Sequence, residues 1–108
     1  MYQGRLKIAL GMYGFEVIAA SHGIDALMQY KTHEGQFGAI ISENSMPKMN
    51  GLELVRSVRE MGYKGEIVVM SGRLTSKQRK EYEPHAISGF FHKPFDVALL
   101  ATMLLQSN

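Results

Sequence analysis

The sequence predicts an α/β protein whose parallel sheet carries helices on both of its faces. Short apolar runs alternate with segments of helical periodicity along the 108 residues, which is typical of strands joined by crossover helices. Two of these runs, Ala39–Ile41 and Ile67–Met70, are apolar on consecutive residues, as expected for parallel strands that are covered on both faces. No repeat or linker interrupts the alternation, so we expect a single domain over residues 1–108.

The chain opens with a helical pattern rather than with a strand. Its first apolar residues follow the spacing of one helix face, and Gly14 supplies a stop. Further along, Asn50 and Glu53 form a capping pair for a helix that ends near Gly62. Cap candidates for the two later helices are Thr75 or Ser76, and Asp96. The expected helices are 2–13, 24–31, 51–61, 75–82 and 96–105, and the expected strands are 15–20, 39–43, 67–71 and 89–92.

Two short strings carry the functional signal. The first is Glu-Asn-Ser-Met-Pro-Lys-Met-Asn-Gly at 43–51, and the second is Phe-Phe-His-Lys-Pro-Phe at 90–95. Both come at the end of an apolar run. In this order they resemble the receiver domain of bacterial two-component response regulators, in which an aspartate ends the third strand and a Met-Pro loop and a glycine follow it. The resemblance implies a flavodoxin-like receiver fold.

The same resemblance assigns roles to four residues. Glu43 holds the place of the phosphoacceptor aspartate, so the reactive residue itself is replaced. Ser71 and Lys93 hold the places of the hydroxyl and the lysine that contact the phosphoryl oxygens in the family. Phe90, three residues before that lysine, holds the place of the aromatic residue that changes rotamer on activation.

The front of the chain departs from the family pattern. Receivers begin with an apolar strand that ends in two adjacent acids, and those acids help to hold Mg²⁺. Only Met1 to Gly4 and Arg5 precede Leu6, the first apolar residue of the helical spacing. This segment is too short for that strand and contains no carboxylate. In the strand order 2-1-3-4-5 of this fold class, the missing first strand is the central one.

An absent central strand leaves backbone groups unpaired, and each such buried group costs about 1–3 kcal/mol. Three outcomes are open at this point. The strands at 15–20 and 39–43 pair directly, or a second copy of the chain fills the gap, or the chain is a shortened form of a longer protein.

The chemistry expected at the site is correspondingly limited. Glu43 alone offers one carboxylate, whereas Mg²⁺ requires near-octahedral oxygen coordination, so we expect no metal, no cofactor and no enzymatic activity. Asp25 and Asp96, the only aspartates, start helices and cannot substitute as acceptors. We expect a Glu43–Lys93 ion pair with Ser71 as a hydrogen-bond neighbour. Glu43 then either mimics the activated state or is a drifted residue at a site that has lost its function. Both interpretations predict that the protein neither accepts nor releases a phosphoryl group.

Composition excludes several classes of function. The 12 Lys and Arg against 10 acids give a net charge of only +2, which argues against a nucleic-acid partner even though the helix at 75–82 is basic. The four histidines lack metal-ligand spacing. No apolar run approaches the length of a membrane helix, and cysteine is absent. We therefore expect a cytoplasmic protein without a membrane contact.

The last helix points to a protein partner. Thr102 is the only polar residue from Val97 to Leu105, so the helix is apolar on more than one face. We expect an interface there, with Val97, Leu100 and Leu104 as its candidates, and we favour a homodimer. The alternative is that these leucines are buried within a single chain, in the space that the missing strand would occupy.

The sequence thus predicts a degenerate receiver-like module of phosphorelay signalling, one that is not phosphorylated and that binds a kinase or another regulator. The alternative is a truncated form of a phospho-accepting response regulator. A third hypothesis is that the chain is a nucleic-acid-binding fragment that uses the basic helix at 75–82. Its binding would then depend steeply on salt concentration.

Overall fold

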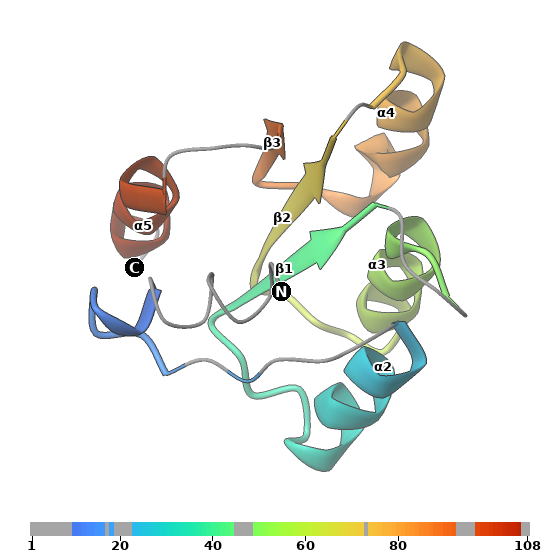
Figure 1. Ribbon diagram of the computed structural model, residues 1–108. Coiled ribbons are helices and arrows are strands. Elements are labelled where there is room, and N and C mark those ends of the chain that lie inside the picture. Colours follow the sequence, from blue (N-terminus) through green and yellow to red (C-terminus); the bar gives the residue numbers. More distant parts are fainter. Residues whose placement is uncertain are drawn as a thin grey trace.

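The structure is a computed structural model that describes residues 10–16, 18, 23–44, 49–72, 74–92 and 97–106. Helices and strands alternate along the described chain, as the sequence predicts (Figure 1). The strands are β1 (Ala39–Glu43), β2 (Glu66–Ser71) and β3 (Gly89–His92). The helices are α2 (Gly23–Thr32), α3 (Gly51–Glu60), α4 (Ser76–Tyr82), the short 3-10 helix η1 (Glu83–His85) and α5 (Val97–Gln106).

The described strands form one parallel sheet in the order β1-β2-β3. Glu43 is in register with Met70, and Ser71 is in register with His92. The three strands therefore end at the same edge of the sheet, where α/β proteins of this type place their functional sites.

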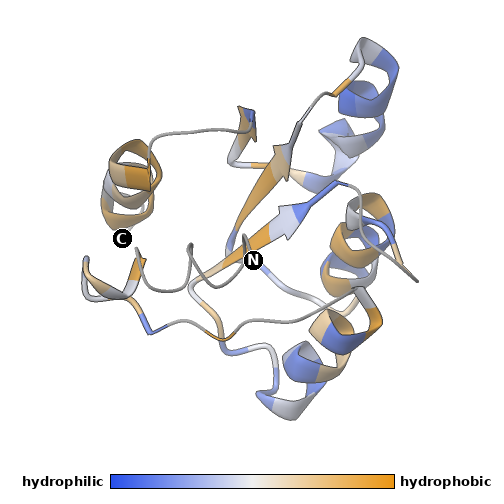
Figure 2. Ribbon diagram, in the orientation of Figure 1, coloured by the Kyte–Doolittle hydropathy of each residue, from blue (hydrophilic) through white to orange (hydrophobic). Residues whose placement is uncertain are grey.

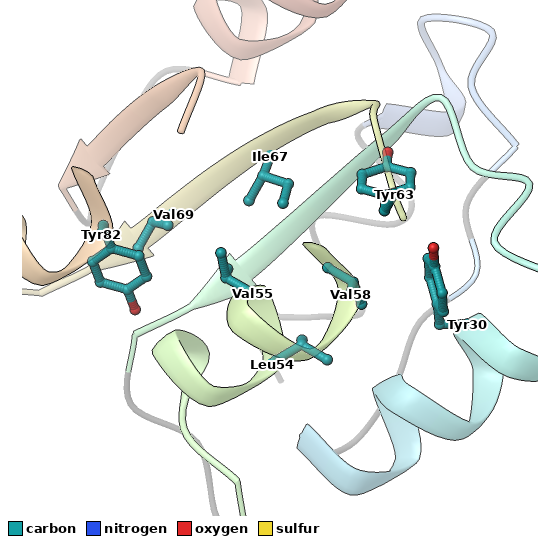
Figure 3. Close-up of a cluster of buried hydrophobic side chains, with 8 residues drawn as sticks. All are labelled: Tyr30, Leu54, Val55, Val58, Tyr63, Ile67, Val69 and Tyr82. Carbon is teal, nitrogen blue, oxygen red and sulfur yellow. The ribbon is translucent and has the colours of Figure 1, made fainter. Parts of the chain in front are cut away.

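Helices cover both faces of this sheet, which confirms the predicted α/β class. Side chains on β2 alternate between two clusters, with Ile67 and Val69 in the first and Val68 in the second. The first cluster packs β2 against α3 and α4, and Figure 3 shows Val55 and Val58 of α3 beneath the sheet. The second cluster packs it against α5. β2 is buried from Ile67 to Ser71, which explains why Ile67 to Met70 are apolar on consecutive residues.

The helix caps predicted from the sequence are present. The side chain of Asn50 accepts from the Glu53 backbone amide at 2.9 Å, and the Glu53 carboxylate accepts from the Asn50 amide, which completes a capping box. Thr75, rather than Ser76, caps α4 with the same reciprocal pattern. Gly62 follows α3 with a φ of 94°, the left-handed conformation that glycine adopts without strain. The cap predicted at Asp96 lies outside the described residues.

The segment before α2 differs from the prediction. Leu10 and Gly11 are helical, and the remainder of the expected helix up to residue 9 lies outside the described chain. The expected strand at 15–20 is not seen in its described residues, because Phe15, Glu16 and Ile18 lie in irregular backbone. A strand needs a hydrogen-bonded neighbour, and within the described residues β1 pairs only with β2. Phe15 instead packs against the second cluster.

The two helices nearest the carboxyl terminus have opposite characters. Figure 2 shows α5 as hydrophobic over most of its length, whereas α4 is mainly hydrophilic. Even so, no helix in the described part of the chain is long and apolar enough to cross a membrane.

Candidate functional site

The candidate site lies at the carboxyl edge of the sheet, where β1 and β2 end side by side. Glu43 is the last residue of β1 and is partly buried, and Ser71 is the last residue of β2 with only 9% of its surface exposed. The structure therefore brings these two predicted site residues to neighbouring strand ends. Lys93 lies outside the described residues, so the predicted ion pair between Glu43 and Lys93 stays a prediction.

The backbone after Glu43 is held by two hydrogen bonds. The Asn44 amide donates to the carbonyl oxygen of Met70 at 2.8 Å, and the Gly51 amide donates to the carbonyl oxygen of Asn44 at 3.0 Å. The second bond joins the start of α3 to the end of β1. The ends of the loop after Glu43 are thereby fixed against each other.

Gly51 is required by the close packing at this point. A Cβ atom on residue 51 would lie 2.3 Å from the carbonyl oxygen of Glu43 and 2.9 Å from the hydroxyl oxygen of Tyr82. The first distance is shorter than any real contact of this kind. The glycine of the sequence motif therefore lets the helix start against the strand end.

Tyr82, the last residue of α4, is a member of the site that sequence reasoning missed. Its hydroxyl donates to Asn44 Oδ1 at 2.6 Å, and the residue is only 1% exposed. Burial, with a smaller contribution from Glu81, raises the pKa of Tyr82 to about 12, so the phenol keeps its proton at neutral pH. A lone aromatic residue at the end of an otherwise polar helix was the signal available in the sequence.

Phe90, the predicted switch aromatic, is partly buried between two side chains of α4. Its ring is T-shaped to the ring of Tyr82, with centroids 5.8 Å apart. The guanidinium of Arg79 lies 4.7 Å from the Phe90 ring centroid, a distance typical of a cation–π contact. One residue of the basic helix is thus engaged within the domain.

The described residues at this edge offer a magnesium ion few oxygen ligands. Within the described ranges, no three His, Asp or Glu side chains gather closely enough to hold a metal. The sequence also contains no two adjacent acids, whereas Mg²⁺ sites rely on several closely placed oxygen ligands. Glu43 is the one carboxylate that ends a described strand at this edge.

Two of the three interface residues predicted on α5 prove to be buried within the chain. Leu100 is 0% and Leu104 is 7% exposed, and both pack in the second cluster, against which the partly buried Val97 also packs. These residues share one helix face because of the three- and four-residue spacing between them. The leucines exposed on α5 are instead Leu99, at 63%, and Leu105, at 52%.

The described strands form a parallel sheet between helix layers, with Glu43 and Ser71 at adjacent strand ends. This arrangement is compatible with the receiver class of α/β proteins. The response regulator receiver domain family matches residues 2–105, and the chain belongs to this family. The chain is therefore a receiver domain of two-component signalling, a class of module that generally acts through protein partners and without enzymatic activity of its own.

Individual relatives agree with this assignment. Two-component response regulator 24 of Arabidopsis thaliana is 26% identical over 99 residues, covering 92% of this chain and 70% of that protein. Sensor kinase CckA of Brucella abortus (strain 2308) is 30% identical over 98 residues, covering 91% of this chain but only 10% of the kinase. The chain thus spans most of the plant regulator and about a tenth of the kinase.

Solved structures show the same fold. The chemotaxis protein CheY4 of Vibrio cholerae superimposes with a TM-score of 0.86 at 26% identity, covering 97% of this chain and 88% of that one. The N-terminal domain of an uncharacterized protein from Wolinella succinogenes gives a TM-score of 0.89 at 23% identity, covering 97% of this chain and 83% of that one.

Proposed function

We propose that this receiver domain works through protein–protein contact and does not accept a phosphoryl group. The observation that carries the proposal is the position of Glu43 at the end of β1, where the family places its acceptor aspartate. A glutamate carries its carboxylate one methylene further from the backbone than an aspartate does. The carboxylate then occupies space that an incoming phosphoryl group requires.

The charge balance at the site supports the same proposal. Phosphoryl transfer needs positive charge to neutralise the transferring oxygens, and bound Mg²⁺ normally supplies it. The carboxylates that would hold this ion are lacking in the described part of the site. We therefore propose a degenerate site that has no metal or cofactor and catalyses no reaction.

Two roles for Glu43 are compatible with this proposal. In the first, its carboxylate pairs with Lys93 beside Ser71 and holds the domain in one fixed state that resembles the activated one. In the second, Glu43 is a drifted residue with no role in signalling. Replacement by an uncharged side chain, Glu43→Gln, separates the two. The first role requires that the NMR signals of Phe90 move in this variant, and the second requires that they stay.

The proposal is tested by incubating the protein with acetyl phosphate and Mg²⁺ and measuring its intact mass. We expect no phosphorylated species, while a receiver with an aspartate and an acid pair, treated in parallel, gains one phosphoryl group. The matched variant Glu43→Asp restores the acceptor but not the metal ligands, and we expect it to remain unmodified as well. A stable acyl phosphate on Glu43 of the unaltered protein would overturn the proposal.

A domain that acts through protein–protein contact needs a protein partner. We propose that the domain binds a kinase or another regulator, and the similarity to a segment of a sensor kinase supports this choice. We also propose that the domain forms a homodimer through α5, whose exposed Leu99 and Leu105 are uncharged. An uncharged apolar face suits self-association because two copies bring no like charges together. The cytoplasmic location stays a prediction from the sequence.

A further inference from the structure

Tyr82 connects two parts of the site that are far apart in the sequence. Its hydroxyl donates to the side chain of Asn44, the residue directly after Glu43, and its ring is T-shaped to the ring of Phe90 on β3. A single side chain therefore contacts both the acceptor-position loop and the aromatic residue in the switch position.

The contact with Asn44 strongly constrains the position of the Tyr82 ring. Tyr82 is 1% exposed, and a buried hydroxyl that loses its partner costs about 1–3 kcal/mol. A phenol ring is rigid, so its hydroxyl can follow a moving acceptor only if the whole ring moves. Gly51 permits the close approach, since a Cβ there would lie 2.9 Å from the hydroxyl oxygen. A shift of the Asn44 side chain would therefore either break this hydrogen bond or carry the ring with it.

The ring contact between Tyr82 and Phe90 links Tyr82 to the face formed by α4 and β3. Arg79 and Tyr82 lie three residues apart on α4 and so share one helix face. Both contact Phe90, with the guanidinium of Arg79 4.7 Å from the ring centroid and the Tyr82 centroid 5.8 Å away. A displacement of Tyr82 changes the packing of Phe90 directly, while Arg79 is exposed and can be reached by a partner.

We propose that Tyr82 is a positioning residue through which the position of the Asn44 side chain sets the position of Phe90 on the α4–β3 face. This inference rests on the proposed function, because it makes that face the part of the receiver whose state a protein partner recognises. The coupling is built from a hydrogen bond at one end of the phenol and a ring contact at the other.

The test is a double-mutant comparison by NMR on the full chain. Asn44→Ala removes the acceptor without touching Phe90, and we expect it to shift the ring signals of Phe90. In a Tyr82→Phe background, which keeps the ring and removes the hydroxyl, we expect this shift to be lost. If Asn44→Ala does not fold, Asn44→Ser shortens the acceptor and allows the same comparison.

Tyr63→Phe is the matched control. Tyr63 is also buried, and its hydroxyl donates to the carbonyl oxygen of Phe37 at 3.0 Å, away from Asn44. We expect Asn44→Ala to shift Phe90 as strongly in this background as in the unaltered protein. The inference fails if Asn44→Ala leaves the ring signals of Phe90 unchanged. It also fails if Asn44→Ala shifts these signals equally with and without the Tyr82 hydroxyl.

These outcomes are separable from those of the proposed function, because no phosphodonor is present. Phosphorylation of Glu43 would remove the proposed function and leave the measured coupling intact. Loss of the coupling in a protein that is not phosphorylated would remove this inference alone.

Discussion

Arg59 donates from Nη2 to the carbonyl oxygen of Ala86 at 3.0 Å, and Ala86 has a left-handed backbone with a φ of 54°. The same guanidinium donates to the carbonyl oxygens of His85 at 2.8 Å, Tyr63 at 2.9 Å and Gly65 at 3.0 Å. It thereby joins α3 to the segments that precede β2 and β3. This cluster lies at the amino ends of the strands, so changes there test stability separately from the candidate site.

Replacement of Arg59 by lysine should destabilise the domain. An ammonium group cannot reproduce the planar fork of four hydrogen bonds, three of which are partly buried, so several carbonyls lose their donor. We expect the free energy of unfolding to fall by about 2–4 kcal/mol, measured by urea unfolding. Arg56→Lys, an exposed change on the same helix, is the control and should stay within about 0.5 kcal/mol. Equal effects of the two variants would contradict the role assigned to Arg59.

Ala86→Gly should not destabilise the domain, in contrast to most alanine-to-glycine changes. A left-handed backbone costs a residue with a Cβ about 1–2 kcal/mol, and glycine removes most of that strain. The flexibility of glycine in the unfolded chain offsets part of the gain, so we expect stabilisation of about 0.5 kcal/mol. Ala98→Gly, within α5, should instead lower stability by about 1 kcal/mol. Thermal unfolding of both variants tests this difference in sign.

Gly51→Ala should disturb both the fold and the site. The added methyl group collides with the carbonyl oxygen of Glu43, and overpacking of this kind costs about 1–3 kcal/mol. Gly38→Ala is the control, because a Cβ there meets no atom within 4 Å. Chemical denaturation should show a loss for Gly51→Ala alone, and NMR should show that the Asn44 signals move with it. A neutral Gly51→Ala would mean that the strand end and α3 can separate freely.

Two buried tyrosines should make the domain sensitive to alkali. Burial raises the pKa of Tyr63 and of Tyr82 from 10.0 to about 12 each, with the charge of Arg59 lowering the former in part. The folded state therefore retains two protons that the unfolded state loses above about pH 10. Their stabilising contribution is complete below pH 10 and is lost as the pH rises to 12, at about 1.4 kcal/mol per pKa unit.

Unfolding measured across this pH range should show the free energy of unfolding falling steeply. The double variant Tyr63→Phe, Tyr82→Phe should have a shallower slope than the unaltered protein. Tyrosinate absorbance that appears well before unfolding in the unaltered protein, and is missing from the double variant, would show that these two phenols ionise in the folded state and would contradict the prediction.

The exposed leucines of α5 should govern self-association. Leu99→Gln, at a side chain that is 63% exposed, should weaken the proposed dimer without disturbing the core. Met28→Gln, on α2 at 61% exposure, is a control of nearly equal exposure on another helix. Light scattering over a range of concentrations measures the solution mass. A strict monomer at every concentration would remove the dimer proposal.

Much of the architecture could be predicted because it depends on local patterns. The runs on β1 and β2 are apolar on consecutive residues, and the structure places both in a sheet covered on two faces. The caps at Asn50 and Thr75 follow from side-chain chemistry within one turn of helix. Ends of the elements agreed to within about a residue because such signals are short in range.

The errors arose where a residue depends on distant neighbours. Leu99 and Leu100 are adjacent leucines in an apolar helix, and the packing of that helix in the second cluster, which includes Val68 of β2, decides which of them is buried. The strand expected at 15–20 is not assigned at Phe15, Glu16 or Ile18, and its other residues lie outside the described chain. Strand propensity alone supplies no hydrogen-bonding partner.

The amino-acid sequence by itself determined the α/β class and the order of the elements, and it predicts Glu43 at the place of the acceptor aspartate. Only the tertiary structure placed the Tyr82 hydroxyl on Asn44, 38 residues away in the sequence, and the Tyr82 ring against Phe90. The physical reason is range. Periodicity and capping act within a few residues, whereas a hydrogen bond between the end of a helix and a strand-end loop exists only after the sheet has assembled.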